Sequence, residues 1–355
     1  MRKLGYIFTV LLCPILLKAQ IQFDVSEAEQ NFIYNLNLYA NYYIDPVIDG
    51  FNNNQVIGWQ QTGRTIRKFS VRFGLSTAST FVRPDMVEFD FYKVGFTNDI
   101  QLADPDNPIL PTVMGGETDN ELDYTVTGYL YGIPVSYTQR VEALDGVTSP
   151  NNAVPNAVPQ LSLGLPYHFE ITGRIFPNVS VQGVKHMEYG FGLKHQISQY
   201  IVGDKSNFHW NVGGFYNQTE YTYVPEMFLQ GENQEFAMKG NALLLETTAS
   251  YDWKFLTAFA QLGYFNAASA FNINGTYRYE LEESTPIGTA PNSDQIAFEV
   301  VDPVEVKSDN NGVKMSVGAT IRVFKVVSLS GSYNYGKEYS SVTANLSFNI
   351  LTWDK

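Results

Sequence analysis

The last third of the chain alternates apolar and polar residues with a period of two. Between Val313 and Val323 every second residue is apolar, and polar residues such as Lys314 lie between them. The same alternation runs over 327–335 and 341–350, with very short connections in between. Successive side chains of a β-strand point to opposite faces, so the pattern predicts three antiparallel strands with one apolar and one polar face. Each segment has about ten residues, the length that a tilted strand needs to cross the hydrocarbon layer of a membrane.

The alternation recurs upstream, so most of the chain from residue 64 to residue 355 is predicted to be strand. It is clearest over 69–76 and 208–217. Further strands are predicted near 86–97, 122–135, 159–165, 168–177, 187–199, 241–253, 255–267, 270–281 and 295–304. The total is about 14, and even numbers are typical of bacterial single-chain barrels. Longer connections are predicted at 98–121, 143–158, 225–240 and 282–294, as in a barrel with short turns at one end and long loops at the other.

The position of the charged residues favours a membrane barrel over a β-sandwich, which would also bury one face of its sheets. Within the predicted strands, charges lie opposite the apolar face: Arg72, Glu170, Arg174, Lys194, Glu246, Asp252, Lys314 and Arg322. A charge at mid-depth on a lipid-facing surface costs about 2–4 kcal/mol, so its absence there is informative. We therefore predict an all-β fold, a transmembrane antiparallel β-barrel over 64–355. The eight charged residues would face its lumen, where opposite charges are expected to pair.

The first 19 residues have the pattern of a secretory signal peptide. Arg2 and Lys3 precede an apolar run over 4–17, and Ala19 offers a small residue for cleavage. The single cysteine, Cys13, lies within this run, so no disulfide is expected in the mature protein. Without the three basic residues of the segment, 20 basic residues remain against 36 acidic ones, a formal net charge of −16. Such a chain would repel nucleic acid. The predicted location is the outer membrane of a Gram-negative bacterium.

Residues 20–63 differ from the rest because their apolar residues recur at helical spacing. Ser26 and Glu29 match a capping box. One face of the helix that follows carries Phe32, Leu36, Tyr39, Ala40 and Tyr43. Pro46 is expected to end the pattern, so we predict a helix over about 27–44. It would act as a plug or cap of the barrel; a surface helix on a soluble domain is the alternative.

Aromatic residues suggest where a ligand would bind. Phe255, Phe259 and Phe265 share the register that is predicted to face the lumen. With Phe32, Leu36, Tyr39 and Tyr43 of the helix they are candidate lining residues of a hydrophobic site, although packing of the phenylalanines against the helix explains them equally well.

No catalytic residue, metal site or cofactor is predicted. His168, His186, His195 and His209 lack a metal-ligand spacing, and no catalytic or phosphate-binding motif is present. The acidic residues of 98–121 match no EF-hand loop and are expected to be solvated.

Several stretches resemble an uncharacterised family of Bacteroidota outer-membrane proteins. They are LPTVMG at 110–115, PQLSLGL at 159–165, EITGRIFP at 170–177 and GFGLKHQISQY at 190–200. That family is distantly similar to long-chain fatty-acid transporters, which are barrels with an N-terminal plug. The resemblance implies a barrel in contact with outer-membrane lipid and lipopolysaccharide that binds or passes hydrophobic small molecules. Two alternatives stay open: a structural or partner-binding barrel of a secretion or surface assembly, and a lipid-modifying barrel enzyme.

Overall fold

The computed structural model describes residues 26–351 apart from 131–132, 148–149, 182, 204, 226–230, 282–295, 325 and 337–338. The predicted signal peptide, residues 1–19, lies outside the described residues. Among the helices in the described part of the chain, none is both long and apolar enough to cross a membrane.

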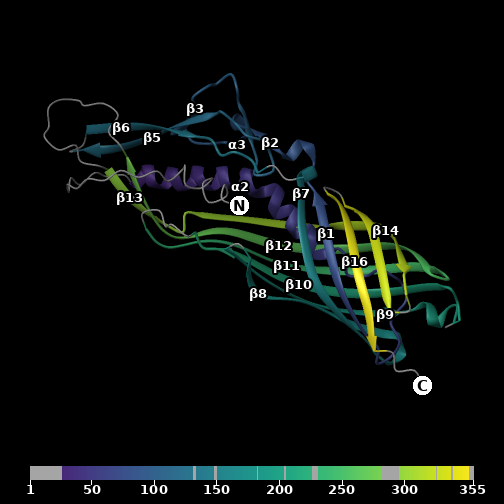
Figure 1. Ribbon diagram of the computed structural model, residues 1–355. Helices are drawn as coiled ribbons and strands as arrows, with labels where there is room; N and C mark the ends of the chain where they lie inside the picture. Colours follow the sequence, from purple (N-terminus) through teal and green to yellow (C-terminus); the bar gives the residue numbers. More distant parts are fainter. Residues whose placement is uncertain are drawn as a thin grey trace.

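The core of the fold is a closed ring of antiparallel strands (Figure 1). The main sheet has 11 strands, of which β13 (Ile296–Val301) pairs only with the far end of β12. The other strands form the ring: β1 (Val71–Phe81), β7 (Ala153–Gly164), β8 (Phe169–Val181), β9 (Val184–Gln196), β10 (Phe208–Tyr223), β11 (Gly231–Trp253), β12 (Leu256–Leu281), β14 (Val304–Arg322), β15 (Val327–Tyr335) and β16 (Ser340–Leu351). The first and last strands, β1 and β16, pair along their whole length, and β11 pairs with β12. Closure leaves the ring no free edge.

The two faces of the ring have opposite polarity. Exposed apolar side chains such as Leu245, Leu262 and Val317 point outward. Buried polar side chains such as Glu246, Gln261 and Ser316, each next to one of them in the chain, point inward. The predicted alternation is therefore present in the folded chain, and it gives the barrel an apolar outer surface.

The two ends of the ring differ in the length of their connections. One end, which we call the turn end, carries 165–168, 197–207, 254–255 and 323–326. The opposite end, the loop end, carries 82–152, and β8, β10 and β15 also end there. β1 begins and β16 ends at the turn end.

The predicted number of about 14 ring strands is wrong for four reasons, the first of which is that residues 296–301 form β13, which pairs only with the far end of β12. Residues 86–97 form no ring strand, because Asp90 caps a short helix, α3 (Phe91–Val94), that ends at Gly95 in the left-handed conformation. Residues 122–130 and 133–135 belong to a separate sheet. The segments 255–267 and 270–281 are one strand, since the inward–outward alternation continues through Ala267 and Ser269 without a turn.

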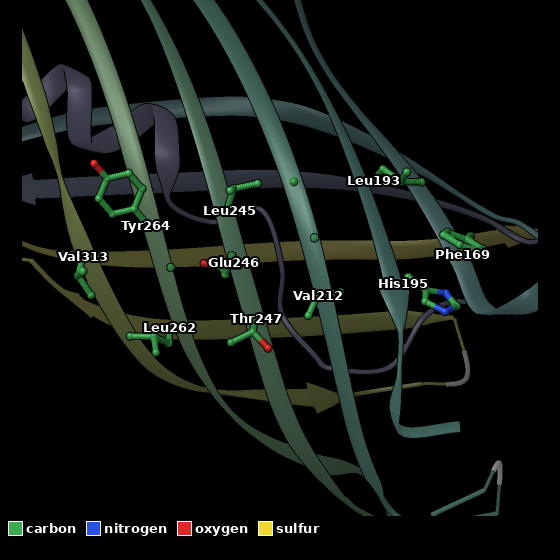
Figure 2. Close-up of a pocket in the computed structure, with 13 residues that line it drawn as sticks. Phe169, Leu193, His195, Val212, Leu245, Glu246, Thr247, Leu262, Tyr264 and Val313 are labelled. Atoms are coloured by element: carbon green, nitrogen blue, oxygen red, sulfur yellow. The ribbon is translucent and has the colours of Figure 1, made fainter. Parts of the chain in front are cut away.

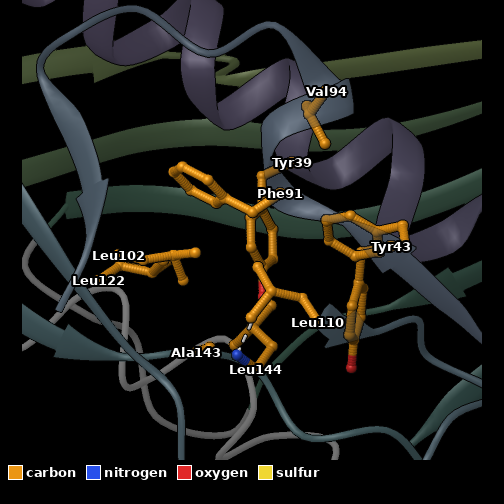
Figure 3. Packing of buried hydrophobic residues seen from close by; sticks show 10 residues of the cluster. Tyr39, Tyr43, Phe91, Val94, Leu102, Leu110, Leu122, Ala143 and Leu144 are labelled. Carbon is orange, nitrogen blue, oxygen red and sulfur yellow. Dashed lines mark hydrogen bonds between the residues drawn. The ribbon is translucent and has the colours of Figure 1, made fainter. Parts of the chain in front are cut away.

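The connection from β1 to β7 folds into a small body that we call the cap, residues 82–147. It contains η2 (Pro84–Met86), α3, and five short strands or hairpin arms: β2 (Glu88–Asp90), β3 (Ile100–Leu102), β4 (Ile109–Pro111), β5 (Glu121–Leu130) and β6 (Ile133–Glu142). Its apolar core packs against the N-terminal helix through Tyr39 and Tyr43, which meet Phe91, Leu110 and Leu144 (Figure 3). The backbone N–H of Leu144 donates to the Tyr39 hydroxyl at 3.0 Å.

The N-terminal helix, α2 (Ser26–Val56), lies between the cap and the long strands β11, β12 and β14 (Figure 1). It is longer than predicted, because Pro46 does not end it. Beyond Pro46, the helix is packed tightly: Ile48 and Asn52 are fully buried, and Phe51 and Val56 are buried. This packing outweighs the one backbone hydrogen bond that a proline removes.

Candidate functional site: a filled lumen and a groove on the outer wall

The chain between α2 and β1 runs through the ring. We call residues 57–66 the inner segment. Six consecutive carbonyl groups of this segment each accept a hydrogen bond from a different inward-facing side chain. The acceptor–donor pairs are Ile57–Arg174, Gly58–Ser76, Trp59–Gln160, Gln60–Gln261, Gln61–Thr320 and Thr62–Asn211.

Backbone N–H groups of the inner segment are bonded in the same way. Gly63 donates to Ser250 at 2.9 Å, Thr65 to Gln196 at 3.1 Å and Ile66 to Glu170 at 2.9 Å. A segment without a strand partner must satisfy its backbone by other means when it is buried. The amide and hydroxyl side chains of the lumen therefore take the place of a neighbouring strand.

The end of α2 makes similar contacts. Asn53 donates to Thr80 at 2.8 Å and also to Ser341, and Asn54 donates to the carbonyl of Val154 at 2.8 Å. These side chains tie the helix to β1, β16 and β7 at the loop end.

The eight lumen charges predicted from the sequence all lie on ring strands, and three carboxylates among them pair with bases. Glu170 lies 3.3 Å from Lys194, Glu246 pairs with Lys314, and Asp252 lies 3.2 Å from Arg322. Asp252 also accepts from Thr257 at 2.6 Å.

Each of these carboxylates also contacts the inner segment. Glu170 accepts from the backbone of Ile66, Glu246 from the side chain of Gln60 at 2.9 Å, and Asp252 lies 3.4 Å from Arg64. The charge pairs are therefore part of the attachment of the inner segment to the wall.

The two remaining predicted lumen bases have other contacts. The Arg174 guanidinium lies 3.8 Å from the ring centre of Trp59 and donates to the Ile57 carbonyl at 2.8 Å. Arg72 donates to Asn349 at 3.3 Å. Arg174 is thus a second kind of anchor, which combines a cation–π contact with a backbone hydrogen bond.

An apolar layer crosses the lumen next to these polar contacts. Trp59 packs on Phe215 with ring centroids 5.1 Å apart, and Leu244 and Phe265 complete the cluster. A cavity beside Gln61 measures only about 10 Å³, about the size of one water molecule. The lumen around the inner segment is therefore filled with side chains.

A larger depression of about 680 Å³ lies on the outer wall of the ring (Figure 2). Its lining residues are Phe169, Leu193, His195, Val212, Gly213, Gly214, Leu245, Glu246, Thr247, Leu262, Gly263, Tyr264 and Val313. We call it the wall groove. It runs obliquely from Phe169 and His195, near the turn end, across β10 and β11 to Tyr264 and Val313.

Glycines open the floor of the wall groove. Gly213 faces inward, where a Cβ would lie 2.9 Å from Phe215 and 3.0 Å from Lys194. Gly214 faces outward, and the nearest atom to its Cβ position is in Leu245 at 3.4 Å. A strand glycine often marks a position that another molecule or backbone approaches closely.

One end of the wall groove carries a histidine. The His195 ring stacks on Phe169 with centroids 4.0 Å apart, and its Nδ1 is buried without a hydrogen-bond partner among the described residues. Thr247 accepts from Trp210 at 2.6 Å, and Glu246 turns into the lumen. The groove is thus an apolar trough with a polar side chain near each end, His195 close to the turn end and Tyr264 at the other.

The structure does not bring together the seven residues predicted to line a ligand site. Tyr39 and Tyr43 belong to the core under the cap, and Phe32 packs edge-on against Tyr124. Leu36 packs with the cluster around Ile48 and Phe271, where the helix meets the long strands.

The three predicted phenylalanines of β12 also separate. Phe259 and Phe265 are buried inside the ring, whereas Phe255 is 62% exposed. The inward register predicted for Phe255 is wrong because the residue lies in the turn between β11 and β12, where the strand alternation is interrupted.

Apart from the lumen charges, the amides of α2 and the inner segment and the glycines of the wall groove were missed in the sequence, although each had a local signal. The run Asn52-Asn53-Asn54-Gln55 and the pair Gln60-Gln61 are clusters of amides, which are suited to bonding a buried backbone. The pair Gly213-Gly214 interrupts a strand pattern.

Comparison with known proteins identifies a family and shows a distant similarity to solved structures of outer-membrane proteins. The model of a family of unknown function, DUF6588, matches residues 1–350. No curated protein matches the chain.

Several solved structures of outer-membrane proteins are similar over most of their length. Ail, the attachment invasion locus protein of Yersinia pestis, is 6% identical, with 80% of this chain and 98% of Ail covered and a TM-score of 0.25. The outer-membrane protease OmpT from Escherichia coli is 9% identical, with 81% and 100% covered and a TM-score of 0.28. A FadL homologue from Pseudomonas aeruginosa is 8% identical, with 81% and 91% covered and a TM-score of 0.25. Since the family model spans nearly the whole sequence, the chain belongs to the family of unknown function DUF6588.

Proposed function

We propose that this protein is an outer-membrane β-barrel that binds a lipid-like molecule in its wall groove while α2 and the inner segment plug its lumen. The observation that carries the proposal is an open apolar groove of about 680 Å³ on the outside of a barrel whose interior is filled. Its volume lies within the roughly 300–1,000 Å³ typical of small-molecule sites.

The membrane location is supported by the polarity of the ring. Its outward side chains are apolar, and its charges are paired inside. A surface of this kind is stable against acyl chains and unfavourable in water. The wall groove would therefore open into the hydrocarbon layer rather than into solvent.

The shape and chemistry of the groove favour a molecule with a chain and a polar head. Leu193, Val212, Leu245 and Leu262 offer only apolar contacts to a chain. The His195 imidazole lies close to the turn end, where the barrel would meet the membrane surface; its Nδ1 is buried and unbonded, so a rotation of the ring would let it bond a polar head group. A fatty acid or one acyl chain of a lipid matches this arrangement, whereas a ligand with polar groups along its length would leave them unpaired.

The lumen supports a plug rather than a path for the ligand. Three buried carboxylates, Glu170, Glu246 and Asp252, and six consecutive backbone carbonyls are engaged between the wall and the inner segment. A hydrophobic molecule that entered the lumen would have to displace these hydrogen bonds without replacing them, which is costly.

Filling the groove tests the proposal. In Gly214→Leu, the new side chain would point outward into the groove, and its Cβ would meet nothing nearer than 3.4 Å. We expect roughly tenfold weaker binding of cis-parinaric acid, a fluorescent fatty acid, because the added side chain takes the space of the chain.

Gly331→Leu is the matched control. Gly331 is an exposed glycine of β15 that does not line the groove, and its Cβ would meet nothing nearer than 3.8 Å. Binding should match that of the unaltered chain. Equal binding by the two variants, or no binding by the unaltered chain in detergent, would rule out the wall groove as the site.

A further inference from the structure

The path of the chain through the ring has a direction, which the strands define. β1 runs from the turn end at Val71 to the loop end at Phe81. The residues that precede β1 are bonded at the turn end, where Ile66 contacts Glu170 and Phe69 donates to the Gly164 carbonyl at 2.7 Å.

The other end of the inner segment lies at the loop end. Asn53 of α2 donates to Thr80, near the end of β1, and to Ser341, near the start of β16. Both residues lie at the loop end. Further towards its start, α2 leaves the ring: Asn37 donates to the Pro303 carbonyl at 2.8 Å, and Asn31 donates to Asp99 of the cap at 2.7 Å. The chain therefore passes once through the barrel from the loop end to the turn end before the first strand begins.

Outer-membrane barrels have short turns on the periplasmic side and longer loops outside the cell. The longest connection, 82–152, is at the loop end, and no connection at the turn end is longer than 197–207. If the barrel lies in the outer membrane, as the proposed function holds, the loop end faces the outside of the cell.

We infer that the barrel threads its own N-terminal segment and displays α2, together with the cap, on the cell surface. The display on the cell surface rests on the proposed outer-membrane location. The inner segment is the part that stays in the lumen, and the polar lumen side chains hold it there. Because the cap comes from a loop-end connection and packs on Tyr39 and Tyr43, α2 and the cap form one body on the same side of the membrane.

The long strands support the same body. β11 and β12 extend past the ring at the loop end, where Phe271, Ile273 and Val304 pack against Ala40 and Ile48 of α2. Strands of this length exceed the roughly ten residues that a bilayer requires, so their far parts would stand outside it. The long strands therefore hold α2 outside the ring, in addition to its covalent link to the inner segment.

Cysteine labelling in intact cells tests the inference. In a Cys13→Ser background, which removes the only cysteine, single cysteines replace Glu27 and Tyr34 of α2, Asp106 of the cap and Lys254 at the turn end. All four positions are exposed, so none of these changes disturbs the packing. The reagent is a membrane-impermeant maleimide, applied before and after lysis, with cell fractionation in parallel.

We expect Glu27→Cys, Tyr34→Cys and Asp106→Cys to react in intact cells and Lys254→Cys to react only after lysis. Reaction of Asp106→Cys without either helix position would overturn the display of α2. Reaction of Lys254→Cys alone would overturn the orientation. No reaction at any position in intact cells would also overturn the inference. If the protein were then missing from the outer-membrane fraction, the proposed location would be wrong as well. If it were present in that fraction, only the display on the cell surface would be wrong.

Discussion

At the scale of single residues, lumen side chains bond the backbone of the inner segment as well as each other. Gln160, Gln261 and Thr320 each donate a hydrogen bond to a backbone carbonyl of the inner segment. Arg174 does the same while its guanidinium covers Trp59. Removing such a side chain leaves a buried acceptor unsatisfied, which costs more than the hydrogen bond contributes.

Arg174→Met is the sharpest change of this kind. We expect it to lower the free energy of unfolding by about 2–4 kcal/mol, because it removes the donor to Ile57 and the contact with Trp59 at a fully buried position. Urea titration of the protein in lipid vesicles measures the change. Arg140→Met is the control, since Arg140 pairs with Asp123 on the exposed β5–β6 hairpin, and the unfolding of the barrel should not change. Equal loss in both variants would refute the role of Arg174.

At the scale of elements, the strands divide into a part that forms the ring and a part that stands beyond it. Exposed and less exposed residues alternate along β14, but only its final part pairs with β15. That part contains Val317, which is 61% exposed on the outer face.

The cost in stability of a charge on this face should depend on how deep the residue lies in the membrane. Val317→Arg should lower the free energy of unfolding in lipid vesicles by about 2–4 kcal/mol, and Val323→Arg, at the turn end, by about 0–1 kcal/mol. Both side chains are exposed on the protein, so packing does not distinguish them. Similar effects at the two positions would contradict the assignment of the outer face to the hydrocarbon layer.

The packing of α2 under the cap should depend on pH. Burial raises the pKa of Tyr39, Tyr43 and Tyr124 above the usual value of about 10. A group whose pKa is raised by folding stabilises the folded state fully below its unfolded pKa, and the stability is lost as the pH rises through that value towards the folded pKa. The cap should therefore loosen above about pH 10.

Near-ultraviolet circular dichroism measures this loosening. The pH is raised from about 8 to about 11.5, which brackets the ordinary tyrosine pKa of about 10. Tyr39→Phe removes one buried titrating group and should reduce the loss of signal, whereas Tyr34→Phe, at an exposed position, should leave it unchanged. A cap that kept its signal throughout would show that tyrosine burial does not control its packing.

At the scale of the whole molecule, the sequence was sufficient for the barrel and insufficient for what fills it. The period-two pattern predicted most of the ring strands and their faces, because polar side chains point inward and apolar side chains point outward along them. It could not give the number of strands, since β12 carries the same pattern through the ring and far beyond it.

The features of the candidate sites could not be predicted because they depend on contacts between residues far apart in the sequence. Pro46 predicted the end of a helix, but contacts with strands more than 200 residues away, such as that between Asn52 and Ser269, keep the helix continuous. The inner segment has no periodic pattern at all, because its partners are side chains from many strands. The wall groove depends on glycines of β10 and β12, which only the register of the folded sheet brings together.

Ion conductance across a planar lipid bilayer tests the central claim, a closed membrane-spanning ring that is sealed by its own N-terminal segment. The unaltered chain should insert without steady conductance. A variant that lacks residues 26–66, and that still shows the compact gel mobility of a folded barrel, should conduct ions through the polar lumen. Steady single-channel currents from the unaltered chain, or a folded deletion variant that stays silent, would contradict the account.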